Sequence, residues 1–287
     1  MPGECHAHMI MDGINYKAAV ALHRDGVCES AVRGHLKECQ DAGIRFVRDG
    51  GDAREVSKLA KELAPEYGIE YLTPIFAIHK RGHYGGIVGH PFDTWQEYRE
   101  LVKRAAEEGA DFIKIMVSGL LDFSHAGTLT EEGLSGEEIR TMIAAAHDAG
   151  MAVMAHCNGD RTCRLTLEAG VDSLEHGFFM EEETLHLLAE KGTPWFPTFA
   201  PVGNLQGCGR FPEEEVKKNL NMQMERVRKA ASLHACIGLG SDAGAYLVPH
   251  GQGTWDEYRY LQCAGVPEDV IEQAENRIKA VFRRGAV

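Results

Sequence analysis

The sequence has few features that would place the protein in a membrane or on nucleic acid. Among its 287 residues, no run approaches the roughly 20 apolar residues that a membrane-spanning helix needs. Its 30 lysines and arginines are outnumbered by 43 aspartates and glutamates, so the formal net charge is −13. Binding to nucleic acid or to an anionic membrane requires a basic patch. The composition therefore argues against both partners and favours a small-molecule substrate.

The eight cysteines lack the spacing of a zinc ribbon, because no two of them form a CxxC pair. Thiols scattered in this way are typical of a reducing compartment rather than of a disulfide framework. The sequence also lacks a basic N-terminal segment followed by an apolar stretch, which is the pattern of a signal peptide. We therefore expect a cytoplasmic protein.

No low-complexity linker divides the chain, so residues 1–287 are predicted to form a single domain. Short apolar runs alternate with amphipathic helical segments, which is the pattern of βα units and a parallel sheet. Eight strands are predicted, at residues 4–10, 44–50, 69–78, 111–118, 151–158, 172–178, 193–200 and 236–242. Because eight parallel strands close a barrel, the predicted fold is α/β, a (β/α)8 TIM barrel of 1–287.

Eight helices are predicted between and after these strands, at residues 29–43, 54–68, 95–109, 137–150, 162–170, 182–192, 213–235 and 268–284. Several end in glycine, which readily takes the left-handed conformation that ends a helix. Three irregular segments, 79–93, 119–135 and 200–212, each follow a predicted strand. Barrel active sites are built from loops in that position.

Polar side chains stand near the ends of five predicted strands. His6 and His8 lie two apart in the first strand, so both rings leave the same face. Alone, this pair could be a polar strand end, and a single strand-end histidine or aspartate is usually a hydrogen-bonded structural residue. The full set, however, converges on the barrel mouth and predicts a metal site: His6, His8, Lys114, His156, His176 and Asp242.

Lys114 is the least ordinary member of this set. It stands between Ile113 and Ile115 in an apolar strand, where burial of an ammonium group is costly without a partner. A structural role is therefore a poor explanation for it.

The stretches "CHAHMIMDG", "GIRFVRDGGD", "DFIKIMVSG", "AHDAGMAVMAHCNG" and "GLGSDAGAYLVPHG" together resemble the amidohydrolase superfamily, in its prolidase-like and imidazolonepropionase-like branch. The resemblance implies that His6, His8 and Asp242 bind one divalent ion, with zinc expected, and that His156 and His176 bind a second. Lys114, carboxylated by carbon dioxide, would bridge the two ions, and its carbamate would balance their charge.

The resemblance also implies an activity. A metal-bound hydroxide would attack the amide carbonyl of a small molecule such as a dipeptide or an N-acyl amino acid. Asp242 would be the catalytic residue, accepting the proton and returning it to the leaving nitrogen. The expected enzyme is thus an amidohydrolase acting on C–N bonds.

Two other functions stay open at this point. One is hydrolytic deamination or cyclic amide opening; deaminases of the superfamily typically keep one metal and place a glutamate after the fifth-strand histidine, where this chain reads "HCNGD". The other is a non-catalytic metal-binding barrel. The metal content distinguishes the three functions: about two ions per chain are expected for the amide hydrolase, one for the deaminase and none for the non-catalytic barrel.

Substrate contacts are expected from residues in or near the irregular segments, namely His83, Tyr84, His125, Arg161, Arg210 and His250. Members of the superfamily commonly carry a small β-sandwich built from residues before the first strand and after the last helix. We expect either that this protein is a barrel-only member or that part of the natural protein is missing from the sequence. A barrel face left open in this way would favour a partner subunit, so a homo-oligomer is a further expectation.

Overall fold

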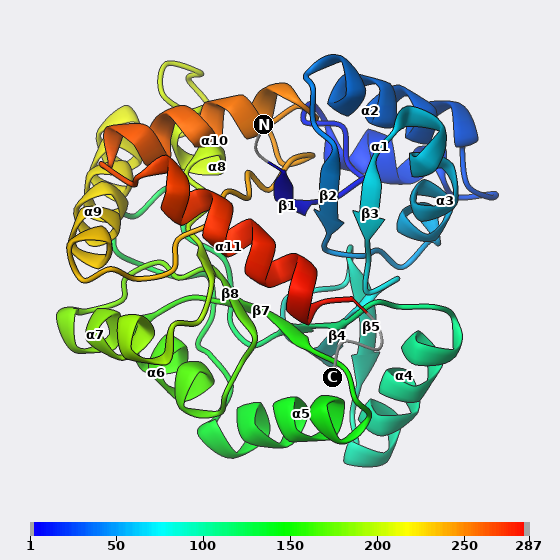
Figure 1. Ribbon diagram of the computed structural model, residues 1–287, viewed down its shortest axis with the longest axis horizontal. Helices are drawn as coiled ribbons and strands as arrows, with labels where there is room; N and C mark the ends of the chain where they lie inside the picture. Colours follow the sequence, from blue (N-terminus) through cyan, green and yellow to red (C-terminus); the bar gives the residue numbers. More distant parts are fainter. Residues whose placement is uncertain (1–2, 284–287) are drawn as a thin grey trace.

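The computed structural model describes residues 3–283, in which helices surround a ring of parallel strands (Figure 1). The strands are β1 (Glu4–Ala7), β2 (Phe46–Asp49), β3 (Glu70–Leu72), β4 (Ala77–Lys80), β5 (Gly89–Phe92), β6 (Ile113–Met116), β7 (Val153–Cys157), β8 (Ser173–His176) and β9 (Trp195–Phe196). Residues 1–2 and 284–287, which the single-domain prediction and the last predicted helix include, lie outside the described residues.

The helices follow the strands in the order that a barrel requires. They are α1 (Tyr16–Leu22), α2 (Glu29–Asp41), α3 (Val56–Leu63), the 3₁₀ turn η1 (Ala64–Tyr67), α4 (Trp95–Glu107), α5 (Gly136–Asp148), α6 (Asp160–Glu168), α7 (Glu182–Lys191), α8 (Ala200–Gly203), α9 (Glu213–Ser232), α10 (Gln252–Cys263) and α11 (Glu268–Val281). Two of them, α4 and α5, begin with complete capping boxes, at Thr94 with Glu97 and at Ser135 with Glu138.

The strands form two parallel sheets, ordered β1-β2-β3 and β5-β4-β6-β7-β8-β9. The ring closes through residues 236–243, which form no regular strand but bond to both neighbours. Trp195 N donates to Cys236 O at 2.9 Å, and Cys5 N donates to Leu239 O at 3.0 Å. The (β/α)8 barrel predicted from the sequence is confirmed, with its eighth position filled by irregular backbone.

The prediction of one continuous strand over 69–78 is wrong. The chain breaks between β3 and β4, where Pro74 offers no N–H and Ile75 takes a left-handed φ of 64°. On one side of the break β3 pairs with β2, and on the other β4 pairs with β6. The prediction that 79–93 is irregular is also wrong in part, because β5 lies within it and pairs with β4.

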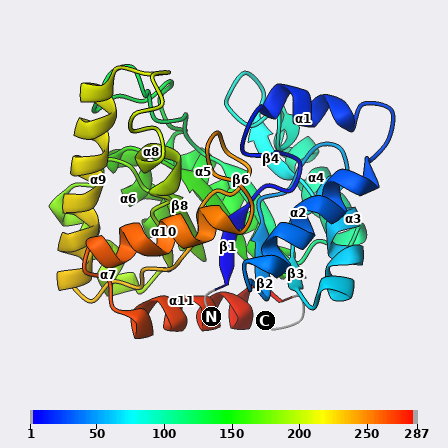
Figure 2. The same ribbon diagram turned by 90° about the horizontal axis from the view of Figure 1, so that it is seen from above.

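Three helices were not expected from the sequence. Only Ala19 is buried in α1, so this helix has no apolar stripe that a periodicity argument could detect. The four-residue α8 lies in a segment predicted to be irregular, and α10 begins after Gly251 in a glycine-rich stretch. Figure 2 shows α1 at the end of the barrel opposite α11, and α8 packs against both α9 and α10.

One end of the barrel is filled with apolar side chains and covered by a helix. Phe46, Phe112 and Phe196 pack there with Ile278 and Phe282, which come from α11 and the residue after it. Figure 2 shows α11 lying across this end. The polar strand ends therefore face the opposite, loop-bearing end, which is where barrel active sites are built.

The surface of residues 3–283 carries few large apolar side chains. The exposed ones are Ile14, Tyr16, Leu22 and Leu120. In the same part of the chain, none of the helices combines the length and apolar character needed to cross a bilayer. The homo-oligomer expected from the sequence stays a prediction.

Candidate metal centre

The six residues that the sequence singles out meet at one cavity of about 390 Å³. We call this set the floor of the cavity: His6, His8, Lys114, His156, His176 and Asp242. The imidazole rings lie close together, with centroids 5.4 Å apart for His6 and His8 and 4.5 Å apart for His156 and His176. The His6 and His176 rings, from β1 and β8, are 4.9 Å apart and link the two pairs.

Three floor residues form a compact set of possible metal ligands. The Nε2 atoms of His6 and His8 lie 3.7 Å and 3.5 Å from Asp242 Oδ1. One ligand atom from each of the three residues lies within 4.8 Å of the others. Two imidazole nitrogens and a carboxylate oxygen are a donor set that suits zinc.

The backbone at the floor is strained. His176 and Asp242 adopt positive φ angles of 66° and 57°, and Thr198, beside His176, has a φ of 53°. A non-glycine residue in this region costs of order 1–3 kcal/mol, and such residues cluster at functional sites. The carbonyl of His176 is held by Trp195 Nε1 at 2.9 Å, so the surrounding structure maintains the unusual conformation.

The histidines of the floor are neutral imidazoles. Burial and the charge of Lys114 lower the pKa of His8 and of His156 to about 3. Burial lowers the pKa of His6 and His176 well below the ordinary value as well. A neutral ring keeps a lone pair for a metal ion, so these histidines are in the protonation state that binding requires.

Lys114 is buried at the centre of this floor with no hydrogen-bond partner for its Nζ atom among the described residues. Burial lowers its pKa to about 8, which increases the fraction of neutral amine. An unpartnered buried amine is costly unless another group occupies the space beside it. The floor residues therefore fit a metal centre in which Lys114 has a further bonding role.

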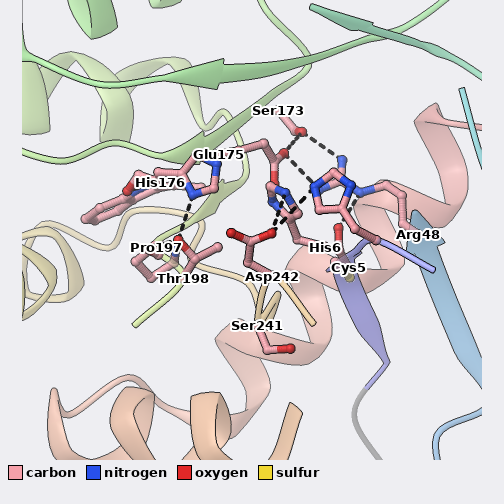
Figure 3. Close-up of polar contacts among 12 residues, drawn as sticks. Cys5, His6, Arg48, Ser173, Glu175, His176, Pro197, Thr198, Ser241 and Asp242 are labelled. Carbon is pink, nitrogen blue, oxygen red and sulfur yellow. Dashed lines mark hydrogen bonds and ion pairs between the residues drawn. The ribbon is translucent and has the colours of Figure 1, made fainter. Parts of the chain in front are cut away.

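Sequence reasoning missed the side chains that hold the histidines from behind. His6 Nδ1 lies 2.7 Å from Glu175 Oε2, and His176 Nδ1 lies 2.8 Å from Thr198 Oγ1 (Figure 3). Glu175 in turn contacts Arg48, whose Nη2 is 2.9 Å from Glu175 Oε1. A charged residue inside an apolar strand was the available signal for Arg48 and Glu175, as it was for Lys114.

The walls above the floor are mostly apolar. We call the residues around the opening the mouth: Met11, Tyr16, Tyr84, Ile87, Leu120, Phe123, Arg210, Phe211 and Tyr246. They come from loops that follow different strands, except for Tyr16, which is the first residue of α1. The guanidinium of Arg210 lies over the Tyr246 ring at 4.4 Å and brings a positive charge to this apolar opening.

The structure brings two of the six predicted substrate contacts to the cavity. Tyr84 lines it, with its ring 5.1 Å from that of His156, and Arg210 lines it at the mouth. His83 does not line it and lies 3.9 Å from Glu131 Oε1 through its Nδ1 atom.

The other three predicted contacts lie away from the cavity lining. His125 is exposed and bonds to Asp122 at 2.8 Å, and Arg161 is exposed on α6. His250 is buried, where its Nε2 atom donates to Met11 O at 2.9 Å and its ring stacks on His35 at 4.3 Å. Any role of His250 at the site is therefore through the loop that carries Met11.

A comparison with protein families shows the family of this chain. The model of the amidohydrolase family matches residues 5–278. The chain belongs to the amidohydrolase family. This membership confirms the resemblance found in the sequence.

The amidohydrolase has curated relatives that are longer than itself. It is 26% identical over 276 residues to ochratoxinase of Aspergillus niger, an alignment that covers 84% of this chain and 57% of ochratoxinase. It is 29% identical over 138 residues to an uncharacterized protein of Mycobacterium bovis, covering 46% of this chain and 37% of that protein. The chain thus spans 37% to 57% of the length of these relatives.

Solved structures share the fold of the amidohydrolase. A Xaa-Pro dipeptidase with bound methionine in its active site matches with a TM-score of 0.74 at 24% identity, covering 99% of this chain and 78% of that one. Ochratoxinase of A. niger matches with a TM-score of 0.75 at 20% identity, covering 100% and 72%. TM-scores of 0.74 and 0.75 over nearly the whole chain establish a common barrel fold.

Proposed function

We propose that this amidohydrolase is a metal-dependent enzyme that hydrolyses an amide bond of a small molecule such as a dipeptide or an N-acyl amino acid. The observation that carries the proposal is the floor itself, where six polar side chains from distant parts of the chain line one cavity. Its size, about 390 Å³, is in the range of small-molecule pockets. The formal charge of −13 also favours a small molecule over nucleic acid.

The proposed centre holds two divalent ions, with zinc as the first candidate. His6, His8 and Asp242 would hold one, and His156 and His176 the other. Lys114, as a carbamate, would be a ligand of both ions. This would give its Nζ atom, which has no hydrogen-bond partner among the described residues, a bonding role. When bound, such ions polarise a carbonyl oxygen and make water a stronger nucleophile at neutral pH.

Asp242 is the residue proposed to move the proton. Its Oδ1 atom lies beside the Nε2 atoms of His6 and His8, and its side chain is 19% exposed to the cavity. The carboxylate would accept a proton from the attacking water as the new C–O bond forms. It would then deliver this proton to the amide nitrogen as the C–N bond breaks, so that the products are a carboxylic acid and an amine.

The mouth is proposed to select the substrate. Its apolar side chains would exclude water from the amide and bind an apolar group. Arg210 would bind a substrate carboxylate, for which its guanidinium offers paired N–H donors. Tyr84, whose ring lies near that of His156, would contact the group next to the amide.

Metal analysis combined with a substrate screen tests the proposal. Protein purified without chelator is expected to contain about two ions per chain. Dipeptides, N-acyl amino acids, cyclic imides and aminated rings would be assayed with zinc supplied. Turnover of an acyclic amide supports the proposal. Turnover of an aminated ring or a cyclic imide alone, or a folded protein that holds no metal, would overturn it.

A further inference from the structure

In three of the four floor histidines, the ring nitrogen that points away from the ion positions is held by a partner, and these partners differ in charge. The Nδ1 atom of the fourth, His8, has no hydrogen-bond partner among the described residues. His6 Nδ1 meets a carboxylate, Glu175 Oε2, at 2.7 Å. His156 Nε2 meets a backbone carbonyl, Gly119 O, at 3.1 Å. His176 Nδ1 meets a hydroxyl, Thr198 Oγ1, at 2.8 Å. One ring therefore has an anionic partner, whereas two have neutral partners.

These partners fix which nitrogen of each ring carries the hydrogen. A carboxylate can only accept, so His6 donates from Nδ1. His156 Nε2 donates to Gly119 O, its nearer partner, because Asn158 Nδ2, 3.4 Å from the ring nitrogen, donates to the same carbonyl at 3.0 Å. The Thr198 hydroxyl gives its own hydrogen to Pro197 O at 2.7 Å, so it accepts from His176 Nδ1 (Figure 3). The lone pairs left for an ion are on Nε2 of His6 and His176 and on Nδ1 of His156.

The carboxylate behind His6 belongs to a buried ion pair. Arg48 is 0% exposed and reaches Glu175 through Nη2, Ser173 Oγ through Nη1 at 2.7 Å, and Cys5 O through Nε at 2.7 Å. Its guanidinium lies 4.6 Å from the centre of the Phe196 ring. Every arm of Arg48 is thus engaged inside the barrel, directly behind the floor.

A buried ion pair contributes little net stability compared with apolar side chains of the same volume. Burying two charges costs several kcal/mol per ion before their attraction is counted, and apolar replacements of similar volume are often as stable or more so. The layer around it, with Phe196 and Phe282, is already apolar. The pair is therefore better explained by its effect on His6 than by its effect on folding.

We propose that Glu175, held by Arg48, is a positioning residue that makes the ion position at His6, His8 and Asp242 the tighter of the two. This inference rests on the proposed function, since it assumes that the floor binds ions. A carboxylate accepting from Nδ1 increases the electron density at Nε2 more than a neutral acceptor does. The position at His156 and His176 has only neutral acceptors, so it fills second.

Zinc titration of the metal-free protein against a chromophoric chelator tests the proposal, because it measures two dissociation constants without any activity assay. The wild type is expected to show two constants. Glu175→Gln keeps the size of the side chain and an oxygen acceptor but removes the charge. We expect it to raise the lower of the two dissociation constants by about 10- to 100-fold and to leave the higher one unchanged.

Two further variants separate this effect from a general loss of structure. Thr198→Val removes the acceptor for His176 and is expected to weaken only the second constant. Asp52→Asn alters a carboxylate of similar burial, which accepts N–H groups of Arg54, Val56 and Ser57. Within residues 3–283 this carboxylate forms no hydrogen bond or ion pair with a histidine. It is expected to lower the melting temperature and change neither constant.

If Glu175→Gln does not fold, Ser173→Ala replaces it, because this change removes only one hydrogen-bond partner of Arg48 and Glu175. The lower dissociation constant is then expected to rise several-fold. If both dissociation constants stay unchanged in the folded variants, or rise by the same factor, the inference is overturned although the wild type still binds two ions. A wild type that binds none would instead overturn the proposed function.

Discussion

The floor and the mouth of the cavity are held in place by different means. On the floor, His6, Lys114 and His156 are at most 2% exposed, and both histidines have a hydrogen-bond partner behind the ring. At the mouth, Tyr16 is 39% exposed and Leu120 is 36% exposed. The side chains of the floor are thus fixed in one arrangement, whereas side chains of the mouth can be substituted with little effect on the stability of the fold. Substitutions on the floor should act on catalysis and those at the mouth on substrate choice.

The largest effect is expected at Asp242, the floor residue proposed to transfer the proton. Asp242→Asn keeps the shape but cannot accept a proton, so turnover should fall by at least about 10³-fold. The circular dichroism spectrum and the melting temperature should stay close to those of the wild type. Turnover that survives this change would remove Asp242 from the proton-transfer role.

Lys114→Ala is expected to have the next largest effect. Without the proposed carbamate the two ion positions lose their shared ligand, so activity should fall by at least about 100-fold. Short carboxylic acids added to the assay should restore part of it, because they can occupy the vacated space and supply the missing oxygens. Lys37→Ala, an exposed lysine of α2 paired with Asp41, is the matched control and should behave as the wild type. Absence of rescue by any acid would count against the carbamate.

The contrast between floor and mouth also explains what the sequence could predict. Four floor residues stand on strands, where a polar side chain in an apolar run is conspicuous, and the other two lie after β1 and near the end of the irregular eighth segment. The order of the strands brings these ends together. Lys114 and His156 were found in this way. Residues in or beside loops carry no such constraint. The sequence therefore predicts His125 and Arg161 as substrate contacts together with Arg210, whereas only Arg210 lines the cavity.

Two other features of the structure could not be predicted from the pattern of apolar residues. The pair of Arg48 and Glu175 is separated by 127 residues, and neither side chain reveals its partner. The break between β3 and β4 follows from local backbone geometry at Pro74 and Ile75, which the apolar pattern of 69–78 conceals. The pattern of apolar residues predicts which segments are strands but not where a strand must bend to join two neighbours.

At the mouth, Arg210→Leu is expected to act on binding. For a substrate with a free carboxylate, KM should rise by about 10-fold with little change in kcat, as expected when an interaction shared by ground and transition states is lost. A neutral amide of the same substrate should be insensitive to the change. Arg161→Leu, on an exposed arginine away from the cavity, is the matched control. An equal loss for both substrates would place the carboxylate site elsewhere.

The smallest effect is expected where the loop after β4 is attached to α5. Lys80 Nζ lies 2.6 Å from Glu138 Oε1, and Tyr84 N donates to Glu131 Oε1 at 2.7 Å, so two carboxylates hold this part of the mouth. Partial burial opposes ionisation of Glu138, but the bonds from Lys80 and Ser135 prevail and lower its pKa to about 2. Because the folded pKa lies below the ordinary value of 4.5, the stabilisation is complete above pH 4.5 and is lost as the pH falls toward 2.

Melting temperatures of the wild type and of Glu138→Gln between pH 3 and pH 6 test this attachment. At pH 6 the wild type should melt a few degrees higher, and the difference should shrink as the pH falls below 4.5, where its own Glu138 begins to take up a proton in the unfolded chain. The effect is small because Lys80 is 39% exposed and solvent screens the pair. A difference that stays constant down to pH 3 would mean that the capping hydrogen bonds at Ser135, rather than the ionised carboxylate, hold this segment of the mouth, and that the mouth is less sensitive to acid than its exposed ion pairs indicate.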